Sequence, residues 1–125
     1  FEVVNIGNPH AVIFVDDVDA VDIQSIGAEL EIHPAFPKRC NVQFVQVMAR
    51  DQIKQRIFER GAGETMASGS GACAGAAAAM HTGQVANQLR VSMPGGELSL
   101  SFDLQTEHIL MTGPTAFSFY GSVEL

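Results

Sequence analysis

The residues best suited to chemistry lie where a glycine-rich segment meets an alanine-rich one. Ser68-Gly69-Ser70-Gly71 precedes a run of small apolar residues that continues to Met80. A helix that begins here presents unpaired backbone N–H groups and the positive end of its dipole. Such a helix start binds anions, carboxylates included. A serine N-cap on a glycine-rich turn explains the same residues without any ligand, so the residues alone leave both interpretations open.

Two further segments carry side chains that can bind ligands or move protons. Glu59 and Arg60 come directly before the glycine-rich segment, and an arginine can hold a carboxylate through two hydrogen bonds while a glutamate faces an ammonium. Asn8 and His10 lie in a Gly-Asn-Pro-His turn, and histidine titrates near neutral pH. An exposed ion pair and a structural turn are the simpler interpretations of these two segments.

Other motif interpretations fail on particular residues. Residues 69–74 fit a relaxed dinucleotide-binding pattern, but no acidic residue lies between Glu64 and Glu97 to hold a ribose. The segment has neither the lysine of a phosphate-binding loop nor a GxSxG pattern. A hydrolase that uses Ser68 with His10 as its base would need an acid to orient the imidazole.

The sulfur and imidazole groups give no sign of a metal centre or a disulfide framework. Cys40 and Cys73 lie too far apart in the sequence for a CxxC motif, and we expect both to be reduced. Cys73 falls inside the alanine-rich run, where a thiol is usually a small buried hydrophobe. His33, His81 and His108 lack mutual spacing and acidic neighbours, so no metal site is predicted.

The elements that position these residues follow from residue patterning. Helical spacing predicts helices over residues 22–32 and 71–81, and the second has no polar face, so we expect it to be buried on all sides. β-branched and aromatic runs predict strands over residues 1–6, 11–17, 41–49, 53–59, 88–93, 97–103, 108–113 and 116–125. This order predicts an α+β fold, a largely antiparallel sheet curled around one central helix in a single domain over residues 1–125.

Composition excludes several classes of partner. Fourteen acidic against seven basic residues give a net charge of −7, and no basic cluster is present, so nucleic acid is not an expected partner. No apolar run of about 18 residues could span a membrane, and the first residues do not resemble a signal peptide. We therefore expect a cytoplasmic protein.

Three motifs, in order along the chain, resemble those of diaminopimelate epimerase, an amino acid epimerase that needs no cofactor. ERGAGETMASGSGACAGAAAAM (59–80) resembles its signature, GNPH (7–10) its loop, and FPKRCNV (36–42) its FPxRxNV segment. GPTAFSFYGSVEL (113–125) is also similar to its closing strand, so the resemblance extends over the whole chain. The resemblance implies a C-terminal lobe that works with a missing N-terminal lobe on diaminopimelate, in lysine biosynthesis, with a homodimer possible.

The resemblance also implies roles for particular residues. In the family, two cysteines, one from each lobe, face opposite sides of the substrate α-carbon, and one removes the proton that the other returns. The matching position here is Ser68, with Glu59 and His10 assisting proton transfer. Implied substrate contacts come from Asn8, Asn41, Glu59, Arg60, Gly69 and Ser70.

Serine at that position changes the expected chemistry. The pKa of a free thiol is about 8.5, whereas the pKa of an aliphatic alcohol is, like that of water, far above the physiological range. Ionising the alcohol at pH 7 would require about 11 kcal/mol, while a helix N-terminus supplies up to about 2 kcal/mol. We therefore expect the lobe to be inactive as given. Two alternatives remain: a noncatalytic lobe that binds a carboxylate or a partner, and a related racemase or dehydratase with altered chemistry.

Overall fold

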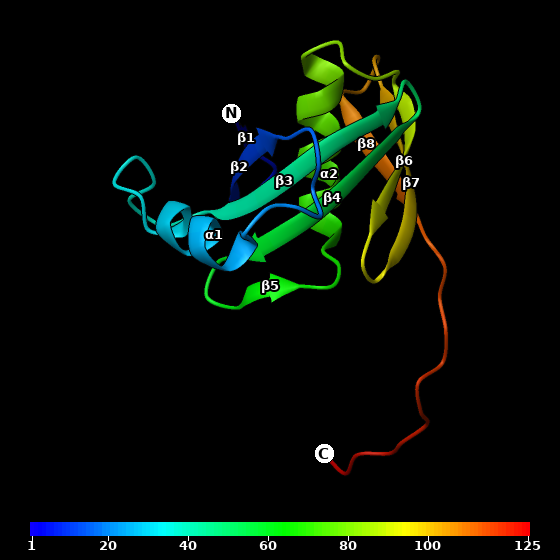
Figure 1. The fold of residues 1–125 in the computed structure, drawn as a ribbon. Helices are drawn as coiled ribbons and strands as arrows, with labels where there is room; N and C mark the ends of the chain where they lie inside the picture. The colour runs from blue at the N-terminus through cyan, green and yellow to red at the C-terminus, as the bar shows by residue number, and fades with distance from the viewer.

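The computed structural model describes residues 1–125 as one α+β unit (Figure 1). The strands and helices are, in chain order, β1 (Glu2–Asn5), β2 (Pro9–Phe14), α1 (Ile23–Glu31), β3 (Asn41–Ala49), β4 (Gln52–Glu59), β5 (Gly63–Thr65), α2 (Gly69–His81), β6 (Gln88–Met93), β7 (Gly96–Asp103) and β8 (His108–Thr112).

All strands belong to one curled sheet, in the order β1-β2-β3-β4-β6-β7-β8 with β5 paired to β4. The β2–β3 and β4–β6 pairs are parallel, and the other five pairs are antiparallel. α1 and α2 form the two crossovers that parallel pairing requires. The prediction of a largely antiparallel α+β sheet is confirmed.

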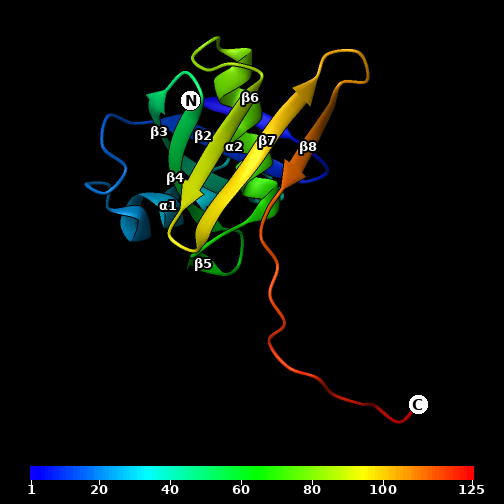
Figure 2. The ribbon, with the colours of Figure 1, turned by 90° about the vertical axis from the view of Figure 1, so that its right-hand side faces the viewer.

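The curled sheet surrounds α2, with β2, β3 and β4 on one side and β6, β7 and β8 on the other (Figures 1 and 2). The main core joins the alanines of α2 to apolar side chains of both halves of the sheet, among them Val45 and Leu100. α1 packs on the opposite face of β3 and β4 over a second cluster that contains Ile23 and Phe44.

Small side chains let the sheet approach the backbone of α2. A Cβ at Gly71 would lie 2.5 Å from Cδ1 of Ile57, and one at Gly75 would lie 2.2 Å from Oε1 of Gln55. Neither position has room for a side chain without movement of its neighbour. The alanine and glycine content of this helix is therefore a packing requirement of the curled sheet.

The expectation that α2 is buried on all sides is wrong. Ser70, Cys73, Ala77 and Met80 are half-buried, and their spacing makes them one stripe along the helix. The stripe is uncovered because the sheet does not close: β1 and β8 are both free edges.

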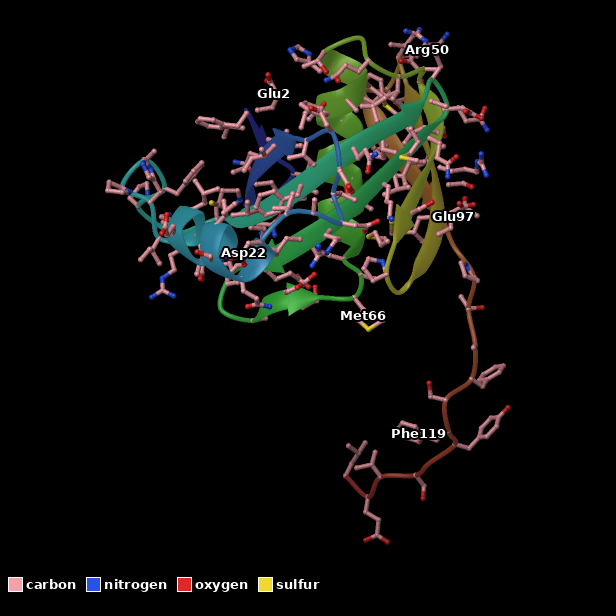
Figure 3. The ribbon with its side chains drawn as sticks, in the orientation of Figure 1. Glu2, Asp22, Arg50, Met66, Glu97 and Phe119 are labelled. Carbon is pink, nitrogen blue, oxygen red and sulfur yellow. The ribbon has the colours of Figure 1, made fainter.

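The predicted strand over residues 116–125 is also wrong. These residues form no strand and run away from the body of the molecule, with Phe119 far from the sheet (Figure 3). Phe117 and Tyr120 are 87% and 86% exposed. Alternating apolar residues fit a strand, but a strand forms only against a partner edge. Conversely, the three-residue β5 was not predicted, since so short a segment carries no period.

Neither helix is both long and apolar enough to span a bilayer.

Candidate active site

Ser68 is the N-cap of α2, as its position before the helix predicts. Its backbone is extended, with φ −149° and ψ 121°, and its Oγ accepts a hydrogen bond from the Gly71 N–H at 3.2 Å. The first turn carries no acidic side chain, and the Ser70 hydroxyl lies 3.4 Å from that of Ser68. The N–H groups of Gly69 and Ser70 precede the first helical hydrogen bond, from Ala72 to Ser68. This helix start can therefore receive a carboxylate.

A second group of predicted site residues is joined by hydrogen bonds where β2 and β3 begin and β4 ends. Asn41 accepts from the Arg60 N–H at 3.0 Å and donates through Nδ2 to the Pro9 carbonyl at 3.3 Å. Nε2 of His10 lies 3.0 Å from Oδ1 of Asn8, and His10 is the register partner of Asn41. Three chain segments thus meet at the ends of these strands through side-chain and backbone groups.

Glu59 links this group to the start of α2. The Thr65 hydroxyl donates to Oε1 of Glu59 at 2.5 Å, and Glu59 pairs with Gly63 across the β4–β5 ladder. Thr65 ends β5 just before Ser68, so β5 ties the helix start to the end of β4. No direct hydrogen bond joins Ser68, Gly69 or Ser70 to the side chains of the strand ends.

Arg60 and Glu59 do not form the ion pair that was the simpler interpretation of these two residues. The Arg60 guanidinium is exposed and donates to the Lys38 carbonyl at 3.1 Å. Glu59 is half-buried and takes its hydrogen bond from Thr65 instead. The guanidinium is therefore accessible to an anion that approaches from solvent.

Burial sets the protonation of the titratable groups near the site. It lowers the pKa of His10, with the Gln43 amide and the Glu59 carboxylate acting in the opposite direction and Arg60 adding to the lowering. Desolvation raises the pKa of both Cys40 and Cys73. Neither cysteine therefore supplies a thiolate at neutral pH.

Sequence reasoning missed Gln43, Gln55 and Thr65. Gln43 and Gln55 are completely buried, although both carry polar amides. The alternation of NVQFVQVMA places Gln43 on the face of β3 that carries Asn41, which is the signal that could have identified it. Thr65 had no sequence signal, because its role depends on the pairing of β5 with β4.

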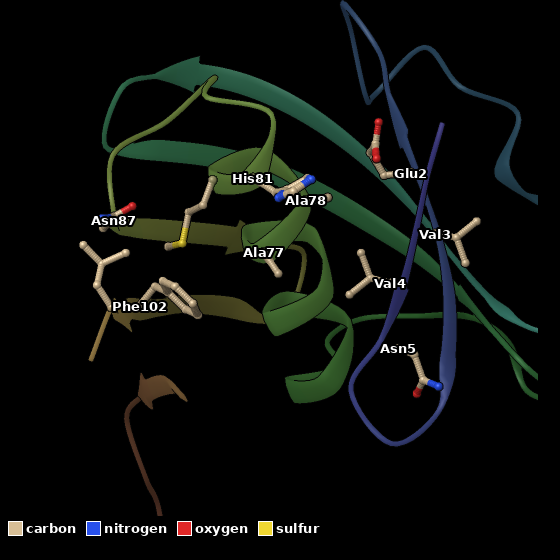
Figure 4. Close-up of a pocket in the computed structure, with 11 residues that line it drawn as sticks. Glu2, Val3, Val4, Asn5, Ala77, Ala78, His81, Asn87 and Phe102 are labelled. Carbon is tan, nitrogen blue, oxygen red and sulfur yellow. The ribbon is translucent and has the colours of Figure 1, made fainter. Parts of the chain in front are cut away.

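One hollow of the chain lies away from these residues. It has a volume of about 570 Å³ and lies between β1, the C-terminal half of α2 and the end of β7, where Val4, Ala77 and Phe102 line it (Figure 4). No group of three or more histidine, cysteine or acidic side chains in the chain could hold a metal ion. The candidate site is the region around the start of α2 and the end of β4.

The α+β fold of the chain is found in solved structures. Solved structures of phenazine biosynthesis proteins of the PhzF family share the fold: one from Bacillus anthracis has a TM-score of 0.60 and 20% identity over 86% of this chain and 34% of its own. A second, from Enterococcus faecalis, also has a TM-score of 0.60, with 18% identity over 78% of this chain and 35% of its own. The chain thus shares its α+β fold with about a third of each of these proteins.

The chain belongs to the diaminopimelate epimerase family, whose family model matches residues 2–118. It is 48% identical to the diaminopimelate epimerase of Picosynechococcus sp. over 98% of this chain and 43% of that protein. The enzyme of Thermosynechococcus vestitus is 46% identical over 96% of this chain and 44% of its own. The chain therefore spans less than half the length of these relatives.

Proposed function

We propose that this chain is one lobe of a diaminopimelate epimerase, in which Ser68 occupies the position of one of the two acid/base thiols. The observation that supports the proposal is the link that β5 makes between two features of the chain. One is a helix start with N–H groups available to a carboxylate. The other is the hydrogen-bonded group of Asn8, His10, Asn41 and Arg60 at the strand ends, connected to that helix start through the contact of Thr65 with Glu59.

The roles follow from charge and position. The substrate is a zwitterion, so its reacting carboxylate binds the Gly69 and Ser70 N–H groups at the positive end of α2. Glu59 faces the ammonium group next to the reacting carbon. Arg60 receives a carboxylate at the distal end of the substrate through its exposed guanidinium. Hydrogen bonds to the carboxylate stabilise the carbanion that forms when the α-proton leaves.

Ser68 does not take part in proton transfer in this proposal. Ionising its hydroxyl at pH 7 would cost about 11 kcal/mol, and a helix N-terminus supplies only up to about 2 kcal/mol. The lobe binds the substrate and orients the α-carbon, but a proton cannot leave to this face. The chain as given is an inactive form of the epimerase lobe.

The other face of the α-carbon requires a second lobe. A single lobe covers one side of the substrate only, and carbanion chemistry in water needs a closed cleft. Large apolar side chains near the start of α2 support such a partner: Met66 is 65% exposed just before the helix, and Met111 is 48% exposed against Gly69. An assembled homodimer and a cytoplasmic location remain predictions.

Substrate binding tests the proposal. The chain would be joined to the remainder of the Picosynechococcus relative, and binding of meso-diaminopimelate would be measured by calorimetry. We expect binding without turnover, weakened at least tenfold by Arg60→Gln, because a charged partner of a carboxylate is lost. Arg50→Gln is the matched control, since Arg50 is exposed and contacts the Gly83 carbonyl at the opposite end of α2.

Equal weakening by both arginine substitutions would contradict the assigned site. A folded chimera that binds simple carboxylates as tightly as diaminopimelate would instead favour the noncatalytic alternative.

A further inference from the structure

Three polar side chains are completely buried between the sheet and α2. His10, Gln43 and Gln55 each have 0% exposure. The atoms left without a hydrogen-bond partner are Nδ1 of His10, both amide atoms of Gln43 and Oε1 of Gln55. Buried polar groups in folded proteins are usually paired, so each exception needs a reason. Gln43 is the most unusual of the three, because both ends of its amide are unpaired.

The sheet register brings Gln43 close to His10. Within the parallel β2–β3 pair, His10 is the partner of Asn41 and Val12 is the partner of Gln43. Paired residues share a face, and side chains two residues apart along a strand lie on that same face. Gln43 is therefore the diagonal neighbour of His10, at a separation that a long side chain can cross.

The imidazole has one nitrogen already engaged. Nε2 of His10 lies 3.0 Å from Oδ1 of Asn8, an oxygen that can only accept, so Nε2 carries the proton of the neutral ring. Nδ1 is the nitrogen that remains for Gln43. The interaction with the Gln43 side chain raises the pKa of His10 against the larger effect of burial, as expected when an amide oxygen accepts from the imidazolium.

We propose that Gln43 is a positioning residue for His10: its buried carbonyl accepts the Nδ1 proton of the imidazolium, while Asn8 accepts the Nε2 proton. The pair of amides fixes the ring plane and provides an acceptor for each proton of the charged form. The assignment of His10 to the reaction depends on the proposed function, whereas the pairing itself concerns only this chain.

Few charged groups compete for this role. Glu59 and Arg60, at the end of β4, act on His10 in opposite directions. The first turn of α2 carries no acidic residue, and burial keeps the Cys73 thiol protonated. On β1, the register partner of His10 is Val4. Gln55, the other buried amide, lies on β4 as the register partner of Val45, so Gln43 is the nearer buried acceptor for a second proton of the ring.

The test is an NMR titration of the imidazole nitrogens in the isotopically labelled 125-residue chain, with His10 assigned through His10→Asn. Gln43→Met keeps the side-chain size and removes the acceptor, so the titration midpoint of His10 should fall by about 0.5 pH unit or more. Gln43→Glu keeps an acceptor and adds charge, so the midpoint should rise.

Gln55→Met is the matched control. Gln55 is equally buried and faces α2, but its Nε2 contacts Sδ of Met93 at 3.7 Å. Gln55→Met should therefore leave the titration midpoint of His10 unchanged. An unchanged midpoint in Gln43→Met, or an equal shift in Gln55→Met, would overturn the proposal. If Gln43→Met does not fold, Gln43→Glu decides, because no rise in its midpoint is also a refutation. The readout uses no substrate, so it stands whether or not the chimera binds diaminopimelate.

Discussion

Ser68→Cys would show directly whether the start of α2 is built to hold an ionised sulfur. The introduced thiolate would take the place of the hydroxyl that accepts from the Gly71 N–H at 3.2 Å, at a helix end without acidic residues in its first turn. A helix N-terminus stabilises a negative charge by up to about 2 kcal/mol in a partly buried position. At about 1.36 kcal/mol for each pKa unit, a thiol of ordinary pKa 8.5 should titrate near 7.

The assay is the pH dependence of thiolate absorbance, checked by alkylation and peptide mapping. The native thiols should contribute little near neutral pH, because burial raises the pKa of Cys40 and Cys73. Ala67→Cys is the matched control: Ala67 is exposed, lies one residue before the cap, and should give an ordinary thiol. If the thiols at both positions titrate together, the helix start gives no special stabilisation and the reasoning fails.

Three further predictions test the fold. Gly27→Ala should destabilise the chain in thermal melts despite a helix-propensity gain of about 1 kcal/mol, because the new Cβ would lie 2.6 Å from Cβ of Phe58; Ser25→Ala on the exposed face of α1 should not. Since burial lowers the pKa of His10, its contribution to stability is present above pH 6.5 and is lost as pH falls through the folded pKa. The free energy of unfolding, measured by urea titration at several pH values, should therefore rise with pH below about pH 6.5. His10→Asn should reduce this pH dependence, whereas His108→Asn should preserve it, because His108 is exposed. Deletion of residues 114–125 should change the unfolding free energy by less than about 0.5 kcal/mol, because they leave the body of the chain; a large loss would show hidden packing.

Much of the fold was predictable because its elements are strongly patterned. The helix after Asp22 has apolar residues at helical spacing, and the alternation in residues 41–49 is that of a strand with one buried face. The serine before α2 was identifiable as a cap because glycine and serine precede a run of good helix formers. Each of these patterns lies within one short segment, so it predicts the local structure without knowledge of the rest of the chain.

The predictions that were wrong concern features that depend on tertiary contacts. Residues 116–125 have the composition of a strand, but the structure offers them no edge, so they stay extended and exposed. The half-exposed stripe along α2, which includes Cys73, depends on the sheet remaining open. Likewise, the buried Gln43 looks like an ordinary strand residue until the register places it beside His10.

The members of the candidate site came from the family resemblance, whereas the hydrogen bonds that connect them came from the structure. The family resemblance named Asn8, Asn41 and Arg60 as substrate contacts, yet only the structure shows that Asn41 accepts from the Arg60 backbone and not from its side chain. The helix start and the strand ends are joined through Thr65, whose contact with Glu59 depends on the β4–β5 pairing.

Entry of solvent deuterium at the α-carbon of diaminopimelate tests the central claim most directly. The experiment compares the chimera that carries Ser68 with its Ser68→Cys variant, in D2O, by mass spectrometry of the recovered substrate. The account predicts exchange and epimerisation with the cysteine, and neither above background with the serine, while both proteins bind the substrate. Exchange as fast with the native serine as with the cysteine would contradict it.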